Sequence, residues 1–242
     1  MGPRRRHPKR RRIMDHQNLE RMIEFESKAA LEQALAQTIA AALKDAIAAK
    51  GAATLLLSGG STPSGVYALL SQADLPWEQV KVGLVDERFV GPSSPYSNFK
   101  LIGETLLQNN AKAATLVPMV SDESDYAGNL LQIEDSYRIF TDTDVCLLGM
   151  GPDGHTASIF PNDAASLAAN TNTSCLLSNT NAPAEPTQRI TCNGPLLRRS
   201  KHLFLMITGT QKKEILAQSE QLHLPIAAFQ TALTETYYTT AS

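Results

Sequence analysis

The sequence predicts an α/β protein with an open, mostly parallel, Rossmann-like β-sheet and helices on both faces. From about residue 22 onward, short apolar runs alternate with longer segments of helical pattern, as in consecutive strand–helix–strand units. Four of these runs are almost continuously apolar, which is typical of parallel strands that are buried on both faces. They are residues 52–57, 80–85, 145–150 and 202–208.

The first half of the chain begins with a short strand at residues 22–25. A long Ala- and Leu-rich helix follows at residues 27–50, with an apolar repeat near 3.6 residues, and Gly51 ends it. Thr62 and Pro63 favour a helix start, as N-cap and first helical residue. The other elements expected in this half are a helix at 63–71, a helix at 98–108, a strand at 115–117 and a helix at 122–139.

The second half contains an Ala-, Asn-, Thr- and Pro-rich stretch at residues 163–187, for which we expect one strand near 175–178. We expect a strand at 189–192 and a helix at 211–219, after the apolar run 202–208. A β-prone run at 234–238 closes the chain, and we expect it to form an edge strand.

The composition, with 43% hydrophobic and 19% charged residues, is that of a globular protein and excludes disorder, collagen or coiled coil as descriptions of the whole. No apolar run approaches the roughly 18 residues of a membrane span, so we expect no membrane partner. Three cysteines at irregular spacing (Cys146, Cys175, Cys192) favour a reducing, cytoplasmic location over a disulfide framework or a structural zinc site.

Residues 1–12 hold seven basic side chains and no acidic one. Without these seven, the formal net charge of −2 becomes −9, so we expect the folded part not to bind nucleic acid. We expect residues 1–20 to be a disordered basic extension and residues 21–242 to form a single domain. An upstream extension of the reading frame, with Met14 as the start, is the favoured explanation of the basic segment; a nucleic-acid arm and a localisation tag are the alternatives.

Ligands bind beyond the carboxyl ends of the strands in such sheets, so the residues that follow each strand indicate the site. Residues 58–63 read SGGSTP, where Gly59, Gly60, Ser61 and Thr62 suit a tight turn that holds a phosphate at a helix start. An ordinary strand-to-helix turn is the alternative.

Three charged residues, 86–88, follow the second apolar run. They are costly to bury unless they reach solvent, a partner or a ligand. Arg88 is suited to hold a phosphate or carboxylate, the alternative being a surface ion-pair cluster. Asn98 follows a Pro- and Ser-rich loop, where it is either a helix cap or a ligand contact.

A Gly-rich loop, GMGPDGHTAS, follows the third run at residues 149–158. It matches the spacing G-x-G-x-x-G, but it lies late in the chain and no acidic residue occurs in 164–184, which argues against a dinucleotide site. Asp153 and His155 are the better feature, because a histidine exposed on such a loop can exchange a proton near neutral pH.

Lys212 and Lys213 follow the fourth run, in the first turn of a helix, where a cation opposes the helix dipole. Either they lie on a solvated face or an anion offsets them. Taken together, the four strand ends predict a small phosphorylated substrate and acid–base chemistry.

These segments resemble the 6-phosphogluconolactonases in SGGSTP (58–63), VDERFV (85–90) with SN (97–98), GMGPDGHTASIFP (149–161) and ITGTQKKEIL (207–216). The resemblance covers roughly residues 22–240. The related glucosamine-6-phosphate deaminases share the GxGxDGH core but continue differently after it, and they favour D-E-Y where this chain has Arg88.

The resemblance implies hydrolysis of 6-phospho-D-glucono-1,5-lactone to 6-phosphogluconate in the oxidative pentose phosphate pathway, without a cofactor or metal. It implies His155 as the base, with Asp153 beside it. It implies a phosphate-side turn at residues 59–62, cationic contacts from Arg88 and Lys212, and secondary contacts from Asn98 and Arg189.

Two other functions stay open: a sugar-phosphate isomerase or deaminase on the same scaffold, and a non-catalytic sugar-phosphate sensor. A sensor of the regulator type needs a DNA-binding helical module, and the first 20 residues show no such pattern. The sequence is compatible with a monomer or a homodimer.

Overall fold

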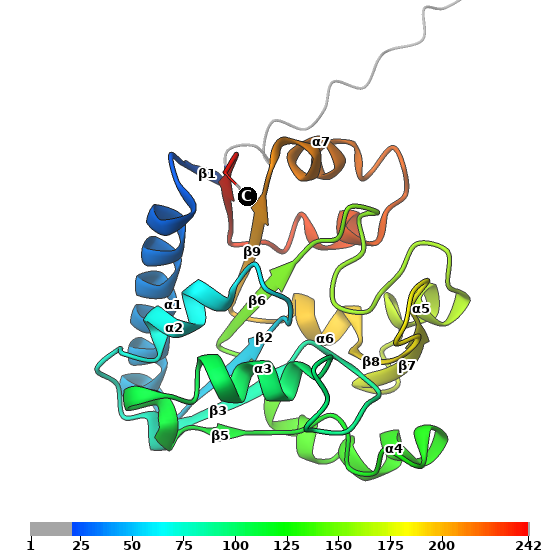
Figure 1. Ribbon diagram of the computed structural model, residues 1–242, viewed down its shortest axis with the longest axis horizontal. Helices are drawn as coiled ribbons and strands as arrows, with labels where there is room; N and C mark the ends of the chain where they lie inside the picture. The colour runs from blue at the N-terminus through cyan, green and yellow to red at the C-terminus, as the bar shows by residue number, and fades with distance from the viewer. Residues whose placement is uncertain (1–20, 242) are drawn as a thin grey trace, which may run out of the picture.

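The computed structural model describes residues 21–241, and its centre is a parallel sheet of seven strands (Figure 1). The strand order is β1-β10-β9-β6-β2-β3-β5, and every pairing in it is parallel. The predicted open, parallel α/β fold is therefore confirmed. The strands are β1 (Met22–Phe25), β2 (Ala53–Leu57), β3 (Val80–Leu84), β5 (Thr115–Leu116), β6 (Val145–Gly149), β9 (His202–Thr208) and β10 (Glu235–Thr239).

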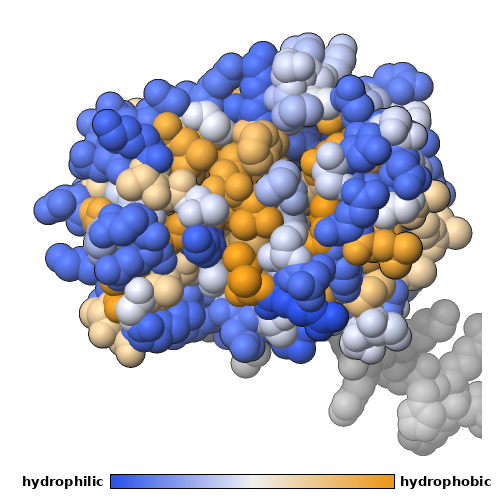
Figure 2. Space-filling model, turned by 90° about the horizontal axis from the view of Figure 1, so that it is seen from below, coloured by the Kyte–Doolittle hydropathy of each residue, from blue (hydrophilic) through white to orange (hydrophobic). Residues whose placement is uncertain are grey.

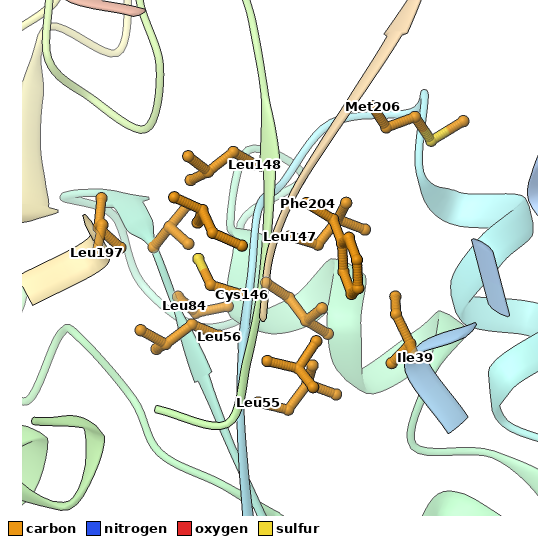
Figure 3. Close-up of a cluster of buried hydrophobic side chains, with 14 of the residues drawn as sticks. Ile39, Leu55, Leu56, Leu84, Cys146, Leu147, Leu148, Leu197, Phe204 and Met206 are labelled. Carbon is orange, nitrogen blue, oxygen red and sulfur yellow. The ribbon is translucent and has the colours of Figure 1, made fainter. Parts of the chain in front are cut away.

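Helices cover both faces of this sheet. Figure 3 shows Ile39 of helix α1 and Leu197 of helix α6 on opposite sides of the strands, with Phe204 pointing toward Ile39 and Cys146 toward Leu197. All four side chains are buried, as the near-continuous apolar strands require. The helices are α1 (Lys28–Lys50), α2 (Ser64–Leu70), α3 (Asn98–Thr105), α4 (Tyr126–Ile133), α5 (Ala164–Ala169), α6 (Gly194–Arg198) and α7 (Thr210–Gln218).

Helix α1 has the boundaries that its sequence signals predict. The Ser27 hydroxyl accepts a hydrogen bond from the backbone N–H of Ala30, and Gly51 ends the helix in a left-handed conformation with φ of 77°. The buried face repeats at three- and four-residue spacing, from Leu31 to Ala46.

A second, smaller sheet was not predicted. It is antiparallel, with the order β4 (Asp86–Arg88), β8 (Gln188–Cys192), β7 (Leu177–Asn181). Val85 joins the two sheets, because its N–H donates to Leu57 of the main sheet while its carbonyl accepts from Cys192. The chain thus leaves the main sheet one residue before the charged triplet, and the triplet becomes a strand of its own.

Three other expectations were wrong. The run at 234–238 is not an edge strand, because β10 lies between β9 and β1 and the edge is β1. The helix expected at 122–139 divides into α4, which the Asp125 side chain caps, and the 3₁₀ helix η4 (Ser136–Phe140). Pro63 occupies the N-cap position of α2, so Thr62 does not cap it.

The remaining 3₁₀ helices are η2 (Trp77–Gln79), η3 (Asn109–Ala113) and η5 (Pro225–Phe229).

The outer surface is mixed in polarity. Figure 2 shows one face, on which hydrophobic residues gather near the middle and hydrophilic residues surround them. Among the large apolar side chains of residues 21–241, Leu131 of α4 is the most exposed, at 87%. Between residues 21 and 241, no helix combines the length and the apolar character needed to cross a membrane. Residues 1–20, for which we expect a disordered basic extension, lie outside the described residues.

Candidate active site

A cavity of about 210 Å³ opens at the carboxyl ends of the main-sheet strands. Strands β2 and β6 are neighbours there. The next strand of the sheet after β2 in the chain, β3, lies on one side of this pair, and the next after β6, β9, lies on the other side. Open α/β sheets bind ligands at such a point, where the strand order reverses. The predicted site residues that line the cavity are Gly59, Gly60, Thr62, Arg88, Asn98, His155, Arg189 and Lys212.

Two predicted residues do not line it. Ser61 is exposed and lies outside the set of lining residues. Asp153 also lies outside this set and reaches the cavity only through its contact with His155.

The turn after β2 lies against helix α3. A Cβ atom at Gly59 would overlap the Asn98 amide, so this position has room only for glycine. Gly60 has φ of 90°, which L side chains rarely adopt. On the buried side, the Tyr67 hydroxyl donates to the Ser58 carbonyl oxygen at 2.5 Å and anchors the start of the turn. The turn is therefore held from both sides, with its backbone close to the cavity.

The side chains of the three consecutive charged residues, 86–88, point to opposite faces of strand β4. Asp86 and Arg88 both line the cavity, and Glu87 between them points the other way, as alternation along a strand requires. The Asp86 carboxylate accepts a hydrogen bond of 2.5 Å from the Ser158 hydroxyl. Asp86 was not among the predicted site residues, although its spacing of two from Arg88 was a usable signal.

Two arginines come together on the small sheet. Arg88 in β4 pairs directly with Arg189 in β8. Arg88 donates from Nη1 to the Tyr96 carbonyl oxygen at 2.7 Å, and its buried Nε has no hydrogen-bond partner among residues 21–241. Arg189 donates from Nε to the Pro186 carbonyl oxygen at 2.7 Å, and burial lowers its pKa.

The two lysines at the start of α7 have different environments. Lys212 lines the cavity, is half-buried, and has a pKa below its ordinary value because of that burial. Lys213 instead forms an ion pair with Glu24 at 2.9 Å and lies 4.5 Å from the centre of the Tyr238 ring. Of the two, Lys212 is the one placed to meet a ligand in the cavity.

His155 and Asp153 form a close pair. His155 Nδ1 lies 2.5 Å from Asp153 Oδ1, and the His155 backbone N–H donates to the same oxygen at 3.2 Å. Partial burial works to raise the pKa of Asp153, but the hydrogen bonds from His155 outweigh it, and the pKa lies below its ordinary value. Asp153 is therefore ionised at neutral pH and accepts a hydrogen bond from the Nδ1–H of His155, which leaves Nε2 as the basic nitrogen.

The loop around His155 is fixed from within. The Gly151 N–H donates to the His155 carbonyl oxygen at 2.9 Å, and a Cβ atom at Gly151 would overlap the imidazole ring. The Thr156 hydroxyl donates to the Gly149 carbonyl oxygen at 2.8 Å, which ties the loop back to β6. The Phe160 ring packs against the imidazole with 4.8 Å between centroids. These contacts hold the imidazole at the cavity wall.

The cavity thus combines a base with three cations and one carboxylate. No group of three or more metal-ligating side chains occurs in the part of the chain that the structure describes. Fold and site together define a class of protein: an α/β protein with a cavity suited to a small anionic ligand, beside a histidine–aspartate pair at the end of a parallel sheet.

Comparisons with known proteins identify the family. The pattern of the glucosamine-6-phosphate isomerases/6-phosphogluconolactonase family matches residues 26–238, and the chain belongs to this family. It is 39% identical over 212 residues to a 6-phosphogluconolactonase of Rhizobium meliloti, covering 84% of this chain and 90% of the relative. A 6-phosphogluconolactonase of Neisseria meningitidis is 37% identical over 202 residues, covering 82% and 87%.

Solved structures agree. The crystal structure of a 6-phosphogluconolactonase from Shewanella baltica superposes with a TM-score of 0.86 at 34% identity, covering 90% of this chain and 97% of that one. The resemblance expected from the four sequence segments is therefore confirmed at the level of the family.

Proposed function

We propose that this protein hydrolyses 6-phospho-D-glucono-1,5-lactone to 6-phosphogluconate, a step of the oxidative pentose phosphate pathway. The observation that carries the proposal is His155, paired with Asp153, at the wall of a cavity that Arg88, Arg189 and Lys212 also line. A substrate with an ester carbonyl at C1 and a phosphate on C6 is matched by such a combination of a base and separate cations. The relatives named above are 6-phosphogluconolactonases, which supports the lactonase branch of the family.

In this mechanism His155 acts as general base through Nε2. It takes a proton from a water molecule whose oxygen attacks the lactone carbonyl carbon. The bond from that carbon to the ring oxygen then breaks, and the imidazolium returns its proton to the departing ring oxygen. Asp153, hydrogen-bonded to Nδ1, fixes the tautomer and stabilises the imidazolium that forms between the two steps.

The phosphate lies at the opposite end of the substrate. Arg88, Lys212 and the turn at residues 59–62 hold it, with Asn98 and Arg189 as further contacts. Since this group does not react, its binding energy positions the carbonyl carbon at His155.

Three expectations belong with this proposal and stay predictions. Residues 21–242 form one lactonase domain behind the basic extension. The enzyme works in the cytoplasm, and it is a monomer or a homodimer.

The direct test is an assay with two substrates. Freshly prepared 6-phosphogluconolactone releases a proton on hydrolysis, because the product acid ionises at neutral pH. We expect proton release well above the spontaneous rate, and no ammonia from glucosamine 6-phosphate. Ammonia release without lactone hydrolysis would assign the protein to the isomerase and deaminase branch, and binding of both compounds without turnover of either would indicate a sensor.

A further inference from the structure

Glu87 is a buried carboxylate beside the site, and its role is separate from the mechanism above. Its side chain is 1% exposed, and its oxygens accept four hydrogen bonds. Oε1 accepts from the backbone N–H of Arg88 at 2.7 Å and of Asn98 at 2.8 Å. Oε2 accepts from the N–H of Phe99 at 2.7 Å and from the Ser97 hydroxyl at 3.2 Å. Each oxygen therefore satisfies two donors.

No cation forms an ion pair with this carboxylate among residues 21–241. Burial raises the pKa of Glu87, and the N–H groups of Asn98, Phe99 and Arg88 oppose that effect without cancelling it. A buried carboxylate that only backbone N–H groups and one hydroxyl hold, with no cation, costs stability compared with a well-packed apolar side chain. The fold therefore keeps a charged group at a position where packing does not require one.

The four donors show what the carboxylate connects. Asn98 and Phe99 are the first residues of α3, whose free N–H groups favour a negative charge. Arg88 is in β4 and its side chain lines the cavity. Glu87 thus attaches the start of α3 to β4.

The consequences reach the turn that is proposed to hold the phosphate. With α3 attached in this way, Asn98 donates from Nδ2 to the Asp86 carbonyl oxygen at 2.9 Å, and its amide lies directly against Gly59. The Tyr96 carbonyl oxygen, two residues before α3, accepts from Arg88. Asn98, Arg88 and the Gly59 turn therefore depend on one another through the position of α3.

We propose that Glu87 is a positioning residue for substrate binding: it holds α3 against β4 and so sets Asn98, Arg88 and the Gly59 turn at the spacing that the anionic end of the substrate requires. The inference rests on the proposed function for the identity of that substrate. Glu87 itself does not touch the substrate. The contacts that it positions bind the anionic end of the substrate equally in the ground state and the transition state, so its loss raises KM rather than lowering kcat.

The test compares Glu87→Gln with a matched control, Asp144→Asn. Gln keeps the size of the side chain, but its NH₂ group cannot accept, so two of the four donors lose their acceptor. Asp144 is also buried and accepts from the Thr54 N–H at 2.8 Å, but it lies at the amino end of β6, the end of the strand opposite the cavity. Its substitution reports the effect of disturbing a buried carboxylate without disturbing the site.

For Glu87→Gln we expect KM for 6-phosphogluconolactone to rise about tenfold or more, the usual weight of a hydrogen bond to a charged group, with kcat within about threefold of wild type. For Asp144→Asn we expect KM unchanged. An unchanged KM in Glu87→Gln would overturn the proposal, because Glu87 would then have no influence on substrate binding. An equal rise of KM in both variants would also overturn it, because the loss of any buried carboxylate would then have the same effect.

A second readout does not depend on the reaction. Amide hydrogen exchange in Glu87→Gln should accelerate at Asn98 and Phe99, and in Asp144→Asn at Thr54, while the affinity for inorganic phosphate should fall in Glu87→Gln alone. If wild type fails to hydrolyse the lactone, the proposed function fails, and these two measurements still decide the role of Glu87. Unchanged exchange at Asn98 and Phe99, or unchanged phosphate affinity, contradicts it.

If Glu87→Gln does not fold, Ser97→Ala takes its place, because it removes one of the four hydrogen bonds to the carboxylate, together with the α3 cap at the Lys100 N–H, and leaves the charge. We then expect a smaller rise in KM, about threefold for one hydrogen bond, with kcat unchanged. An unchanged KM in this variant would equally refute the inference.

Discussion

Arg88 and Arg189 are direct cross-strand partners, in the antiparallel pairing of β4 with β8. Like charges at such positions repel each other. Asp86 lines the cavity beside the two, but the Ser158 hydroxyl already occupies one of its oxygens. An anion in the cavity would neutralise both guanidinium groups, so the pairing favours an anionic ligand at this point.

Neutralising Arg88, as Arg88→Met, should therefore weaken binding of the phosphorylated substrate. We expect KM for 6-phosphogluconolactone to rise about tenfold to a hundredfold, and kcat/KM for unphosphorylated glucono-1,5-lactone to change little. Steady-state assays with both lactones check this. Equal losses with both would show that Arg88 serves the fold or the reacting carbonyl instead.

The lowered pKa of Lys212 predicts a pH dependence of ligand binding. Because burial lowers this pKa below the ordinary 10.5, Lys212 loses its proton at a lower pH than an exposed lysine. Binding of a phosphate favours the charged form, so affinity should fall as pH rises through the lowered pKa. Calorimetric titration with 6-phosphogluconate between about pH 7.5 and about pH 10 measures this, and Lys212→Arg, which stays charged, should give a flat profile. A wild-type affinity that is constant over this range contradicts the placement of Lys212 at the phosphate.

Gly59→Ala should weaken substrate binding through steric overlap alone, without removing a charge or a hydrogen-bonding group. The added methyl group overlaps the Asn98 amide, so either Asn98 or the turn must move, and we expect a rise in KM of about tenfold or more. The control is Gly103→Ala in α3, where a Cβ meets nothing within 4 Å. That variant should keep wild-type kinetics and gain about 0.4–1 kcal/mol of stability. Wild-type KM in Gly59→Ala would show that the close approach of turn and Asn98 is unimportant for binding.

The main sheet was predictable because most of its strands are continuous apolar runs in the sequence. Strands such as β6 and β9 are apolar on both faces, and a helix such as α1 carries a cap at each end. The small sheet was not predictable in the same way. The strands expected near residues 175–178 and at 189–192 correspond to β7 and β8, but β4 has only three residues, all charged, and it pairs with β8, which is about 100 residues away in the chain. Long-range pairing of this kind leaves no local pattern.

The candidate site was partly predictable for the same reason. Residues that follow buried parallel strands must meet at one edge, and eight of the ten predicted site residues line one cavity; their roles stay predictions. Asp86 and Glu87 were treated as one group with Arg88, because the sequence does not show that residues 86–88 leave the main sheet. Only that departure lets the Asp86 side chain line the cavity and the Glu87 side chain contact the start of α3.

Asp153→Asn should lower kcat while leaving KM for the lactone nearly unchanged. The neutral amide stabilises the imidazolium less and also allows the wrong tautomer of His155. Because Asp153 is proposed to act only through His155, the double variant with His155→Asn should be no slower than His155→Asn alone. Independent, multiplying losses would mean that Asp153 has a role of its own.

His155→Asn tests the account most directly. The measurement is proton release from freshly prepared 6-phosphogluconolactone, corrected for spontaneous hydrolysis, for wild type and variant at equal folded concentration. We predict that kcat falls by roughly 10²–10⁴, the usual contribution of general acid–base catalysis, while KM and the melting temperature stay close to wild type. A variant that keeps more than about a third of the wild-type kcat would remove His155 from the mechanism, since a general base cannot be deleted at so small a loss.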